Sequence, residues 1–402
     1  MESDAYQIIV SLALLLLAAK LFGEASARLR LPSVLGEIVA GVILGPSILG
    51  WVKPSFTIQT ISTIGIMLLL FLAGLEIDLD TMRKMGGAAL SVAAFGVIVP
   101  MGIGTLVFRL TGESLRAAFF VGAIMTATSI GLTLRSLMDM GKFRTREGTT
   151  VVTAAVIDDV IGIFILTILV SVVTAGELPS ALHVLELIGV IVFFFTAVLV
   201  LGFWGSKWLT SLVSRMWVDE ALVAMSICFA IALGWLASSV KVAEITGAFL
   251  AGLVLNPTRE KRAIADRLNT IGYGFFIPIF FAYIGINTKL GALPKAGIMS
   301  IFFILIAIFG KIIGCGVGAR PWFDTRMSLA IGVGMIPRAE VALIMATIGL
   351  QAGAIGDEIF VMTILMVFVT NLLTPILLKL SFRWAEKKEA GKCEEEIGTA
   401  TA

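Results

Sequence analysis

The sequence predicts an all-α polytopic membrane protein with thirteen transmembrane helices. Hydrophobic residues make up 58% of its 402 residues and charged residues only 14%, whereas charged residues make up about 25% of a typical soluble domain. Apolar stretches of roughly 20 residues, the length that crosses a bilayer core, recur along nearly the whole chain. We therefore place all function in the membrane part, residues 1–385, and expect no soluble domain.

The apolar stretches give approximate bounds for each span. They are 7–24, 32–50, 58–76, 86–108, 115–137, 150–174, 182–206, 219–238, 241–256, 271–287, 296–318, 327–350 and 357–380. Only the short turn from Ser238 to Lys241 separates two of them, so twelve or fourteen spans are alternatives. The acidic start, with Glu2 and Asp4, is unlike a cleaved signal peptide and favours a retained first helix. The polar tail, residues 386–402, is expected to be disordered.

Loop charges predict the topology. Of the 30 Lys and Arg residues, 22 fall on the side that receives the carboxyl terminus and 6 on the side of the amino terminus. The positive-inside rule then puts the amino terminus outside and the carboxyl terminus in the cytoplasm, which suits the plasma (inner) membrane of a prokaryote. Basic clusters such as Lys142, Arg144 and Arg146 are interpreted as topology signals, so no nucleic-acid partner is expected.

The cysteines and the histidine indicate no cofactor or resident metal site. Cys228, Cys315 and Cys393 share no spacing typical of metal ligands. The single histidine, His183, lies at the mouth of a helix and is interpreted as structural.

An internal repeat is visible when the two halves of the sequence are aligned. AGVILGP (40–46) matches AGLVLNP (251–257), and the same offset carries Gly74 onto Gly285 and the segment MTATS (125–129) onto IPRAE (336–340). The units would start at the second and ninth spans. Because an odd number of crossings separates them, the two units would have opposite orientations in the membrane, which is an inverted repeat.

The fifth and twelfth spans both look interrupted. TATSIGLT (126–133) and GVGMIPRAE (332–340) place polar residues, glycine and proline at mid-membrane depth. A broken helix is tolerated there only where it faces protein or a water-filled cavity, so a midplane binding site is predicted. The polar residues of these breaks are Thr126, Thr128, Ser129, Arg338 and Glu340. We expect Arg338 to pair with an acid, Glu37 or Glu244.

Two adjacent acids, Asp158 and Asp159, lie in the apolar stretch TAAVIDDVIGIFIL (153–166). Each costs about 2.5–3.5 kcal/mol at the centre of a membrane helix, so both need a compensating partner or water. Adjacent helix positions are about 100° apart. One acid can therefore pair with a cation, for which Lys311 is the candidate, while the other faces a cavity. An ionised carboxylate there can hold a small monovalent cation and a protonated one cannot, which couples cation movement to proton movement.

These segments resemble the monovalent cation/proton antiporters, specifically the electrogenic sodium/proton exchangers of bacteria and archaea. The resemblance covers residues 7–380 and is carried by the following segments: LPSVLGEIVAGVILGPSILG (31–50), FLAGLEIDL (71–79), TATSIGLTLRSLMDMG (126–141), AAVIDDVIG (154–162), the Lys311 helix and GMIPRAEVALI (334–344). It implies the sodium/proton antiporter fold, with two crossed discontinuous helices, elevator-type alternating access and a homodimer. It also implies a core bundle that includes about 58–174 and 271–380, and a dimerisation bundle that includes about 7–50 and 182–256.

The same resemblance assigns roles to single residues. Asp159 is implied as the main carrier of sodium or lithium and of protons, with Asp158 paired to Lys311 when no sodium is bound, and with Thr128 and Ser129 lining the site. Lys311 is also a candidate for a second proton carrier, because a buried lysine that loses its counter-ion can release its proton. Two protons against one sodium would make exchange electrogenic and would link it to pH homeostasis.

Three other functions are weighed against this one. Potassium/proton antiport is the main alternative, although potassium efflux relatives usually carry Gln before the Asp and a long nucleotide-binding tail. A passive cation channel is a second alternative. An intramembrane aspartyl protease, which is an enzyme, is disfavoured because its two aspartates come from different helices, whereas Asp158 and Asp159 are neighbours on one helix.

Overall fold

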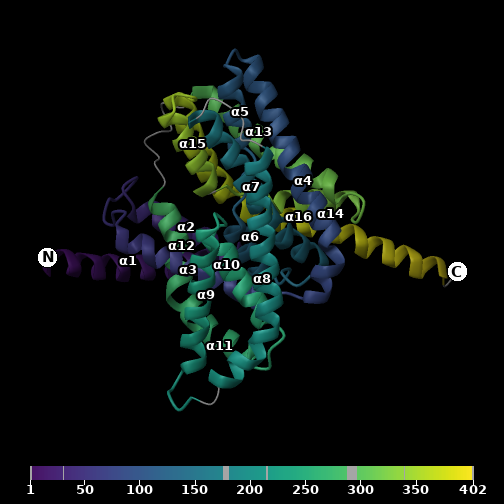
Figure 1. Ribbon diagram of the computed structural model, residues 1–402. Coiled ribbons are helices and arrows are strands. Elements are labelled where there is room, and N and C mark those ends of the chain that lie inside the picture. Colours follow the sequence, from purple (N-terminus) through teal and green to yellow (C-terminus); the bar gives the residue numbers. More distant parts are fainter. Residues whose placement is uncertain are drawn as a thin grey trace. The chain divides into compact units, whose positions relative to one another are not determined.

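The computed structural model describes residues 2–29, 31–174, 181–213, 216–287, 297–338 and 340–400. These residues are overwhelmingly helical and contain no strand (Figure 1). The first half contains α1 (Glu2–Arg28), α2 (Ser33–Leu44), α3 (Phe56–Glu76), α4 (Leu79–Leu110), α5 (Leu115–Ile124), α6 (Ile130–Asp139), α7 (Arg146–Thr174) and α8 (Ala181–Val213). The second half contains α9 (Ala221–Ser239), α10 (Glu244–Leu255), α11 (Lys261–Ile271), a π-helical turn (Gly272–Phe276), α12 (Ile277–Ile286), α13 (Gly297–Ala319), α14 (Thr325–Gly334), α15 (Glu340–Gln351) and α16 (Asp357–Ala400).

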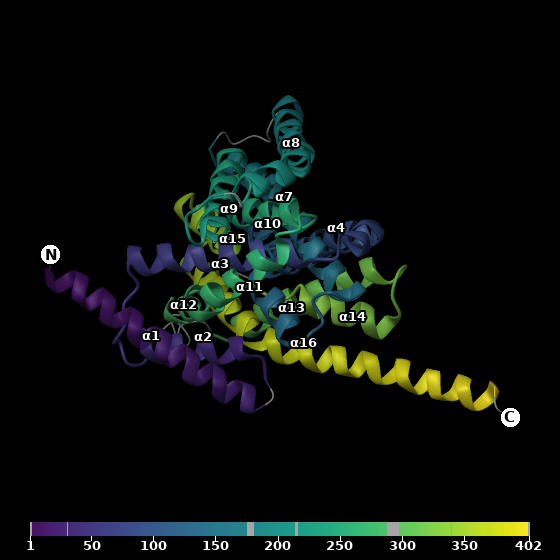
Figure 2. The same ribbon diagram turned by 90° about the horizontal axis from the view of Figure 1, so that it is seen from below.

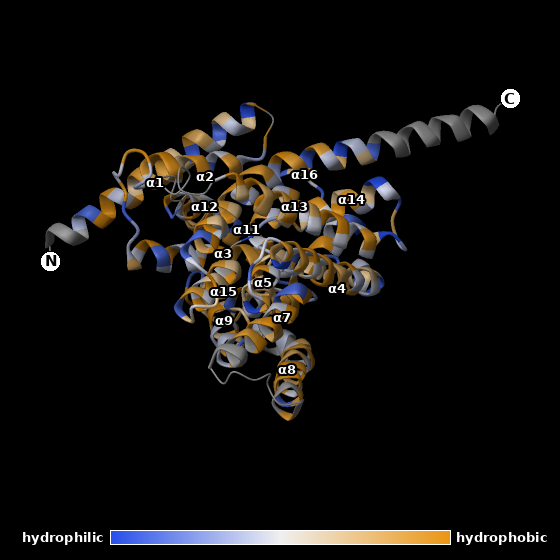
Figure 3. Ribbon diagram, turned by 90° about the horizontal axis from the view of Figure 1, so that it is seen from above, coloured by the Kyte–Doolittle hydropathy of each residue, from blue (hydrophilic) through white to orange (hydrophobic). Residues whose placement is uncertain are grey.

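Each of the thirteen predicted spans coincides with a helix or with a pair of consecutive helices. Within the described residues, nine helical segments have the length and apolar composition to cross a membrane, and the rest of the spans are shorter apolar helices such as α2 and α10. Hydrophobic residues run along the helices while hydrophilic ones gather at helix ends and loops (Figure 3). The all-helical polytopic fold is therefore confirmed, including the closely spaced pair α9 and α10.

The chain divides into two compact units. The first unit comprises Met1–Leu79 and Ile163–Gly291, and the second comprises Asp80–Gly162 and Ala292–Ala402. One boundary falls after Leu79, the first residue of α4, and another falls inside α7, after Gly162.

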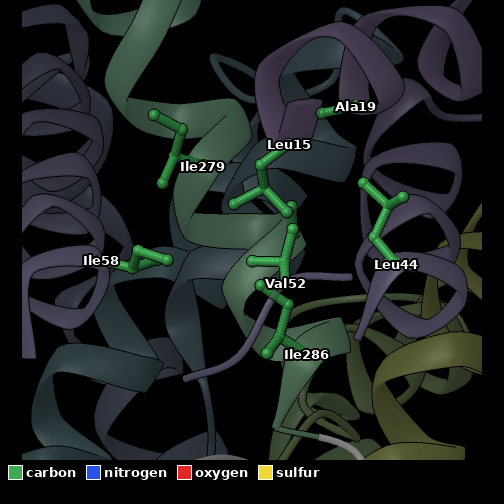
Figure 4. Close-up of a cluster of buried hydrophobic side chains, with 8 residues drawn as sticks. Leu15, Ala19, Leu44, Val52, Ile58, Ile279 and Ile286 are labelled. Carbon is green, nitrogen blue, oxygen red and sulfur yellow. The ribbon is translucent and has the colours of Figure 1, made fainter. Parts of the chain in front are cut away.

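In the first unit, α2 packs between α1 and α12, and α10 packs against α3 and α9 (Figures 1 and 2). Its apolar interior is visible where α1, α2, α3 and α12 meet. Side chains from these helices and from the loop at Val52 converge there (Figure 4). The buried members are Leu15, Ala19, Leu44, Val52, Ile58, Ile279, Ala282 and Ile286.

In the second unit, α14 packs against α13 and α16, and α15 packs against α5 and α16. Small residues let α13 approach α4: a Cβ added at Gly314 would overlap the carbonyl oxygen of Phe95, and one added at Gly310 would press on Pro100. The buried rings of Phe108 on α4 and Phe303 on α13 meet edge to face, with centroids 5.4 Å apart.

Two boundaries differ from those expected. Helices α3 and α12, which the sequence assigned to the core bundle, pack with α1, α2 and α10 in the first unit. The tail expected to be disordered continues α16 as helix to Ala400. Alanine, glutamate and lysine dominate the segment WAEKKEAGKCEEE (384–396), and these residues have high helix propensity, which outweighs its lack of apolar residues. The functional meaning of the two bundles stays a prediction.

Equivalent helices of the two repeats pack in equivalent ways in the first unit. Helices α2 and α10 begin at Ser33 and Glu244 and end at Leu44 and Leu255, so both ends keep the offset seen between the two sequence motifs. Four glycines then make matching close contacts, which we call the glycine contacts: Gly41 with the Ala282 carbonyl, Gly252 with the Phe71 carbonyl, Gly74 with Phe249 and Gly285 with Ile38. Every partner is the repeat equivalent of its counterpart. A Cβ at any of the four would overlap backbone atoms of the facing helix.

The repeat extends one span further than the sequence indicated. A Cβ at Gly36 would overlap the carbonyl of Phe22 in α1, and a Cβ at Gly247 would overlap the carbonyl of Leu233 in α9, again at the same offset. The repeats therefore comprise α1–α7 and α9–α16, with α8 between them. Seven crossings separate α1 from α9, and an odd number gives the two repeats opposite orientations.

Candidate functional site

All the site residues predicted from the sequence lie in the second unit, around the two interrupted spans. Helix α5 ends at Ile124 and α6 begins at Ile130; α14 ends at Gly334 and α15 begins at Glu340. The breaks predicted at TATSIGLT and GVGMIPRAE are therefore confirmed. Ser129 directly precedes α6 with an extended backbone, so the chain leaves the helical path there and re-enters it.

The two breaks cross and are joined by hydrogen bonds, an arrangement that we call the polar crossing. The Ser129 amide donates to the Pro337 carbonyl at 2.8 Å. The Thr133 hydroxyl donates to the Gly334 carbonyl at 2.6 Å. Thr126 turns back on its own helix, donating its hydroxyl to the Ala123 carbonyl at 2.8 Å. These bonds satisfy backbone groups that the interruption releases and that lipid could not satisfy.

Arg338 holds the polar crossing together. Its side chain is fully buried. Nη1 donates to the carbonyls of Met335 and Ile336 at 3.1 and 2.8 Å. Nη2 donates to the carbonyls of Met125 and Ala307 at 2.9 and 3.2 Å. Met125 and Met335 follow the last residues of α5 and α14, so one guanidinium serves the carboxyl ends of both half-helices, where the helix dipoles are negative.

The expected pairing of Arg338 with Glu37 or Glu244, two residues of the first unit, stays a prediction. Within the second unit, Arg338 donates hydrogen bonds to four backbone carbonyls. Carbonyls at the ends of two short helices carry partial negative charge and lack intrahelical partners, so they can replace an acid as the acceptor of a buried guanidinium.

Asp158 and Lys311 form a buried ion pair. Lys311 Nζ lies 3.1 Å from Asp158 Oδ1, and the two side chains are 2% and 0% exposed for the aspartate and the lysine. A Cβ built at Gly96 of α4 would overlap the sulfur of Cys315 and would lie 3.5 Å from Lys311 Nζ, so the glycine leaves room for the Cys315 side chain beside the lysine. Arg338 is an electrostatic neighbour of Asp158. The structure thus brings together the lysine and one of the two aspartates, as the sequence suggested.

Asp159, the neighbour of Asp158 on α7, lies in a different environment. It is half-buried, whereas Asp158 is fully buried. This agrees with the rotation of about 100° between adjacent helix positions, which turns the two carboxylates toward different surroundings. One acid is thus committed to a lysine inside the protein, while the other retains contact with the exterior of the chain.

The remaining predicted residues lie at the breaks themselves. Thr128 and Ser129 are both buried, and no described atom accepts or donates a hydrogen bond at Thr128 Oγ1. Glu340 is the first residue of α15, where a negative charge suits the helix dipole. The side chain of Glu340 and residue Ala339 lie outside the described part of the structure.

The register of the repeat shifts by one residue at the breaks. Helices α5 and α14 begin at Leu115 and Thr325, and α6 and α15 begin at Ile130 and Glu340. In both pairs, the residue offset between the starts of the two equivalent helices is one smaller than the offset between the starts of α2 and α10. The offset used on the sequence is therefore wrong for these segments. The corrected register sets Thr128 opposite Arg338, so the two halves of the polar crossing differ in charge.

Sequence reasoning did not single out Thr133, Gly96 or Pro337. Thr133 lies in the quoted segment TATSIGLT, one helical turn after Ser129, and that spacing was the available signal. Gly96 contributes only by lacking a side chain, and Pro337 only through its carbonyl, so neither carries a chemical signature in the sequence.

Chemically, this arrangement combines an exchangeable charge with a fixed frame. Arg338 and the inter-break hydrogen bonds fix the backbone, and Asp158 and Lys311 form a buried pair of opposite charges beside them. The half-buried Asp159 carboxylate can bind either a cation or a proton. Carboxylate, hydroxyl and carbonyl oxygens are the ligands that hard cations prefer.

Comparison with known proteins identifies the family of the chain. A family model described as "Sodium/hydrogen exchanger, transmembrane" matches residues 11–384. The chain is 35% identical over 389 residues to the Na(+)/H(+)-K(+) antiporter GerN of Bacillus cereus, covering 95% of this chain and 98% of that protein. It is 32% identical over 376 residues to a Na(+)/H(+) antiporter of Enterococcus hirae, covering 92% and 96%.

A solved structure supports the fold. The sodium proton antiporter MjNhaP1 of Methanocaldococcus jannaschii superimposes with a TM-score of 0.73 at 18% sequence identity, covering 94% of this chain and 97% of that one. The likeness in fold, the match of the family model along nearly the whole chain and the identity to full-length relatives lead to one conclusion: this multi-pass membrane protein belongs to the sodium/hydrogen exchanger family.

Proposed function

We propose that the protein exchanges protons for sodium or lithium ions across the membrane, with Asp159 as the shared carrier. The observation that carries this proposal is the unequal placement of two adjacent acids. Asp158 is buried against Lys311, while Asp159 is half-buried on the same helix. A carboxylate that releases its proton to bind a cation, and releases the cation to regain its proton, couples the two flows without any covalent step.

Binding of the cation would involve both acids. Oxygens of Asp159, Asp158, Thr128 and Ser129 are the ligands that we propose, with Asp158 becoming available when the cation displaces the Lys311 ammonium. Lys311, deprived of its counter-ion, then releases its proton. Two protons moving against one sodium transfer one net charge per cycle, worth about 2.3 kcal/mol per 100 mV, so the membrane potential would contribute to extrusion.

Three further features belong to the same proposal. Alternating access would occur by an elevator-type movement of the bundle that holds the polar crossing, because its hydrogen bonds tie both breaks into one body. The protein would act as a homodimer in the plasma membrane of a prokaryote. The excess of basic residues on one side supports an external amino terminus and a cytoplasmic carboxyl terminus.

Exchange of potassium for protons is the second candidate. The name of GerN, the relative at 35% identity, includes potassium as well as sodium. Selectivity between these ions depends on small differences in cavity dimensions and in ion hydration, and no single residue type in the sequence sets it.

The test is an exchange assay in proteoliposomes that carry an imposed pH gradient, with each alkali cation added in turn. We expect sodium and lithium to dissipate the gradient and potassium not to do so. A response confined to potassium would favour the second candidate. Cation flux that continues when the pH gradient is absent and cannot be driven uphill by it would indicate a passive channel.

A further inference from the structure

A groove of about 420 Å³ opens on α8 and α9 in the first unit, and its lining contains none of the residues of the proposed transport site. Its volume is within the range of about 300–1,000 Å³ that is typical of ligand pockets. Eight of the nine lining residues are uncharged and apolar, and the ninth is a glutamate. The lining residues are Glu186, Gly189, Val190, Phe193, Phe194, Ala197, Val198, Leu236 and Val240.

The groove is open at the surface of α8 and contains space that no side chain fills. Phe194 forms a buried floor at 4% exposure, whereas Phe193 on the rim is 74% exposed. A Cβ built at Gly189 would meet no atom within 4 Å. An apolar trough of this kind accepts a flexible hydrocarbon chain more readily than a rigid polar ligand.

The charged end of the groove lies at the level of the lipid headgroups. Helix α8 has 33 residues, so at about 1.5 Å per residue it is roughly 50 Å long and exceeds the hydrocarbon core of about 30 Å. Glu186 lies near its start, and Val240 directly follows the end of α9. Since α8 and α9 are consecutive spans, these two ends share one membrane side. The exposed Trp235, in the last turns of α9, is typical of the interface.

Two opposite charges flank this end. The Glu186 carboxylate lines the groove, and the exposed Lys241 follows the lining residue Val240. A phospholipid headgroup that carries both a phosphate and a primary ammonium complements the pair, with phosphate toward Lys241 and ammonium toward Glu186. A second copy of this chain seated here would instead take the Glu186 carboxylate out of water, which is costly without a partner.

We propose that the groove between α8 and α9 binds a phosphatidylethanolamine-type phospholipid, with one acyl chain along the Phe193–Phe194 trough and the ammonium group on Glu186. The positive-inside pattern assigns this end of the groove to the outer leaflet. Occupancy of the groove can be measured without any ion flux. The test of this proposal is therefore separate from the test of the proposed transport cycle.

The experiment measures lipid binding to the purified, delipidated full-length protein by native mass spectrometry. Phosphatidylethanolamine, phosphatidylcholine and phosphatidylglycerol with identical acyl chains are compared. Phosphatidylcholine has a quaternary ammonium that cannot donate a hydrogen bond, so we expect phosphatidylethanolamine to bind about tenfold more tightly than the other two. Glu186→Gln should remove this preference while leaving binding through the acyl chain.

Two glycines on α8 give a matched pair of groove variants. Gly189→Leu fills the trough and should abolish binding of phosphatidylethanolamine. Gly205→Leu adds the same side chain on the same helix, also where a Cβ meets no atom within 4 Å, but outside the lining. It should bind the lipid as the wild type does. Exchange activity close to wild type in both variants would show that they fold.

Several results would overturn the proposal. Equal affinity of the wild type for all three lipids would remove the headgroup recognition, and unchanged binding by Gly189→Leu would remove the groove. A change of oligomeric state in Gly189→Leu, with lipid binding intact, would identify the groove as a contact between two copies. If Gly189→Leu does not fold, the ratio of the two zwitterionic lipids in Glu186→Gln decides the matter alone.

Discussion

The two units of this protein differ in how closely equivalent positions of the two repeats match. In the first unit the glycine contacts are symmetric: each close approach between helices recurs in the other repeat with the equivalent partner. In the second unit the equivalent positions differ in charge. Thr128 in one break corresponds to Arg338 in the other. Pro100 on α4 corresponds to Lys311 on α13, because a Cβ at Gly122 would overlap the Met101 carbonyl as one at Gly332 would overlap the Ile312 carbonyl.

This difference arises because helix packing and cation binding place different demands on equivalent positions. Close approach of two helix backbones depends only on the absence of a Cβ, so a duplicated sequence can keep it in both copies. A cation site needs a directed set of charges, and a symmetric set would place like charges on both sides of the crossing. The second unit therefore departs from symmetry at the three charged positions that form its buried electrostatic set, Asp158, Lys311 and Arg338.

The largest effect is expected from Asp159→Asn. The amide has nearly the shape of the carboxylate but cannot alternate between a cation and a proton, so exchange should fall to background while the protein still folds. Exchange in proteoliposomes and thermal stability in detergent measure the two outcomes. Glu113→Gln, at an exposed acid of the same unit, is the control and should exchange normally. Residual proton-coupled sodium transport in Asp159→Asn would assign the carrier to another residue.

The next largest effect is expected at Arg338. Arg338→Gln leaves several buried carbonyls without donors, each at about 1–3 kcal/mol, so we expect exchange to fall by at least about tenfold and the melting temperature to drop. Arg338→Lys keeps the charge but not the four donor contacts and should be intermediate. Arg109→Gln, at an exposed arginine on α4, is the matched control. Equal tolerance of all three substitutions would show that the polar crossing holds without this clamp.

The double variant Lys311→Gln with Asp158→Asn addresses the asymmetry between Lys311 and Pro100. Removing both partners avoids the penalty of about 3–5 kcal/mol for a stranded buried charge. We expect the variant to exchange sodium for protons without carrying current. Exchange is measured while a potassium diffusion potential is switched between zero and inside-negative, and only the wild type should respond. A variant that still responds to the potential would make Lys311 a structural partner only.

The smallest effect on transport, and a test of the symmetric unit, comes from the glycine contacts. Gly41→Ala and Gly252→Ala each place a Cβ against a facing carbonyl, so each should lower the free energy of unfolding by about 1–3 kcal/mol, with similar values for the two. Gly102→Ala on α4, where a Cβ meets no atom within 4 Å, is the control. Strongly unequal losses at Gly41 and Gly252 would mean that the repeat symmetry does not extend to energetics.

The sequence by itself determined the spans, the breaks and the repeat, because each depends on local composition. Hydropathy over about 20 residues reports membrane burial directly, and the polar segment at Thr126–Ser129 could not remain a regular lipid-facing helix. Two adjacent acids and one lysine in otherwise apolar helices likewise left few partners to choose from, which is why the pairing of Lys311 with one aspartate was predictable.

Only the tertiary structure decided how Arg338 is satisfied, which helices group into each unit, and the one-residue shift of register at the breaks. Backbone carbonyls have no signature in a sequence, so the convergence of Met125, Met335, Ile336 and Ala307 on one guanidinium appears only when two half-helix ends meet in space. Gly96 illustrates the same reason: it makes room for Cys315 beside Lys311 by the side chain that it lacks, and one glycine among 41 becomes informative only when its neighbour is known.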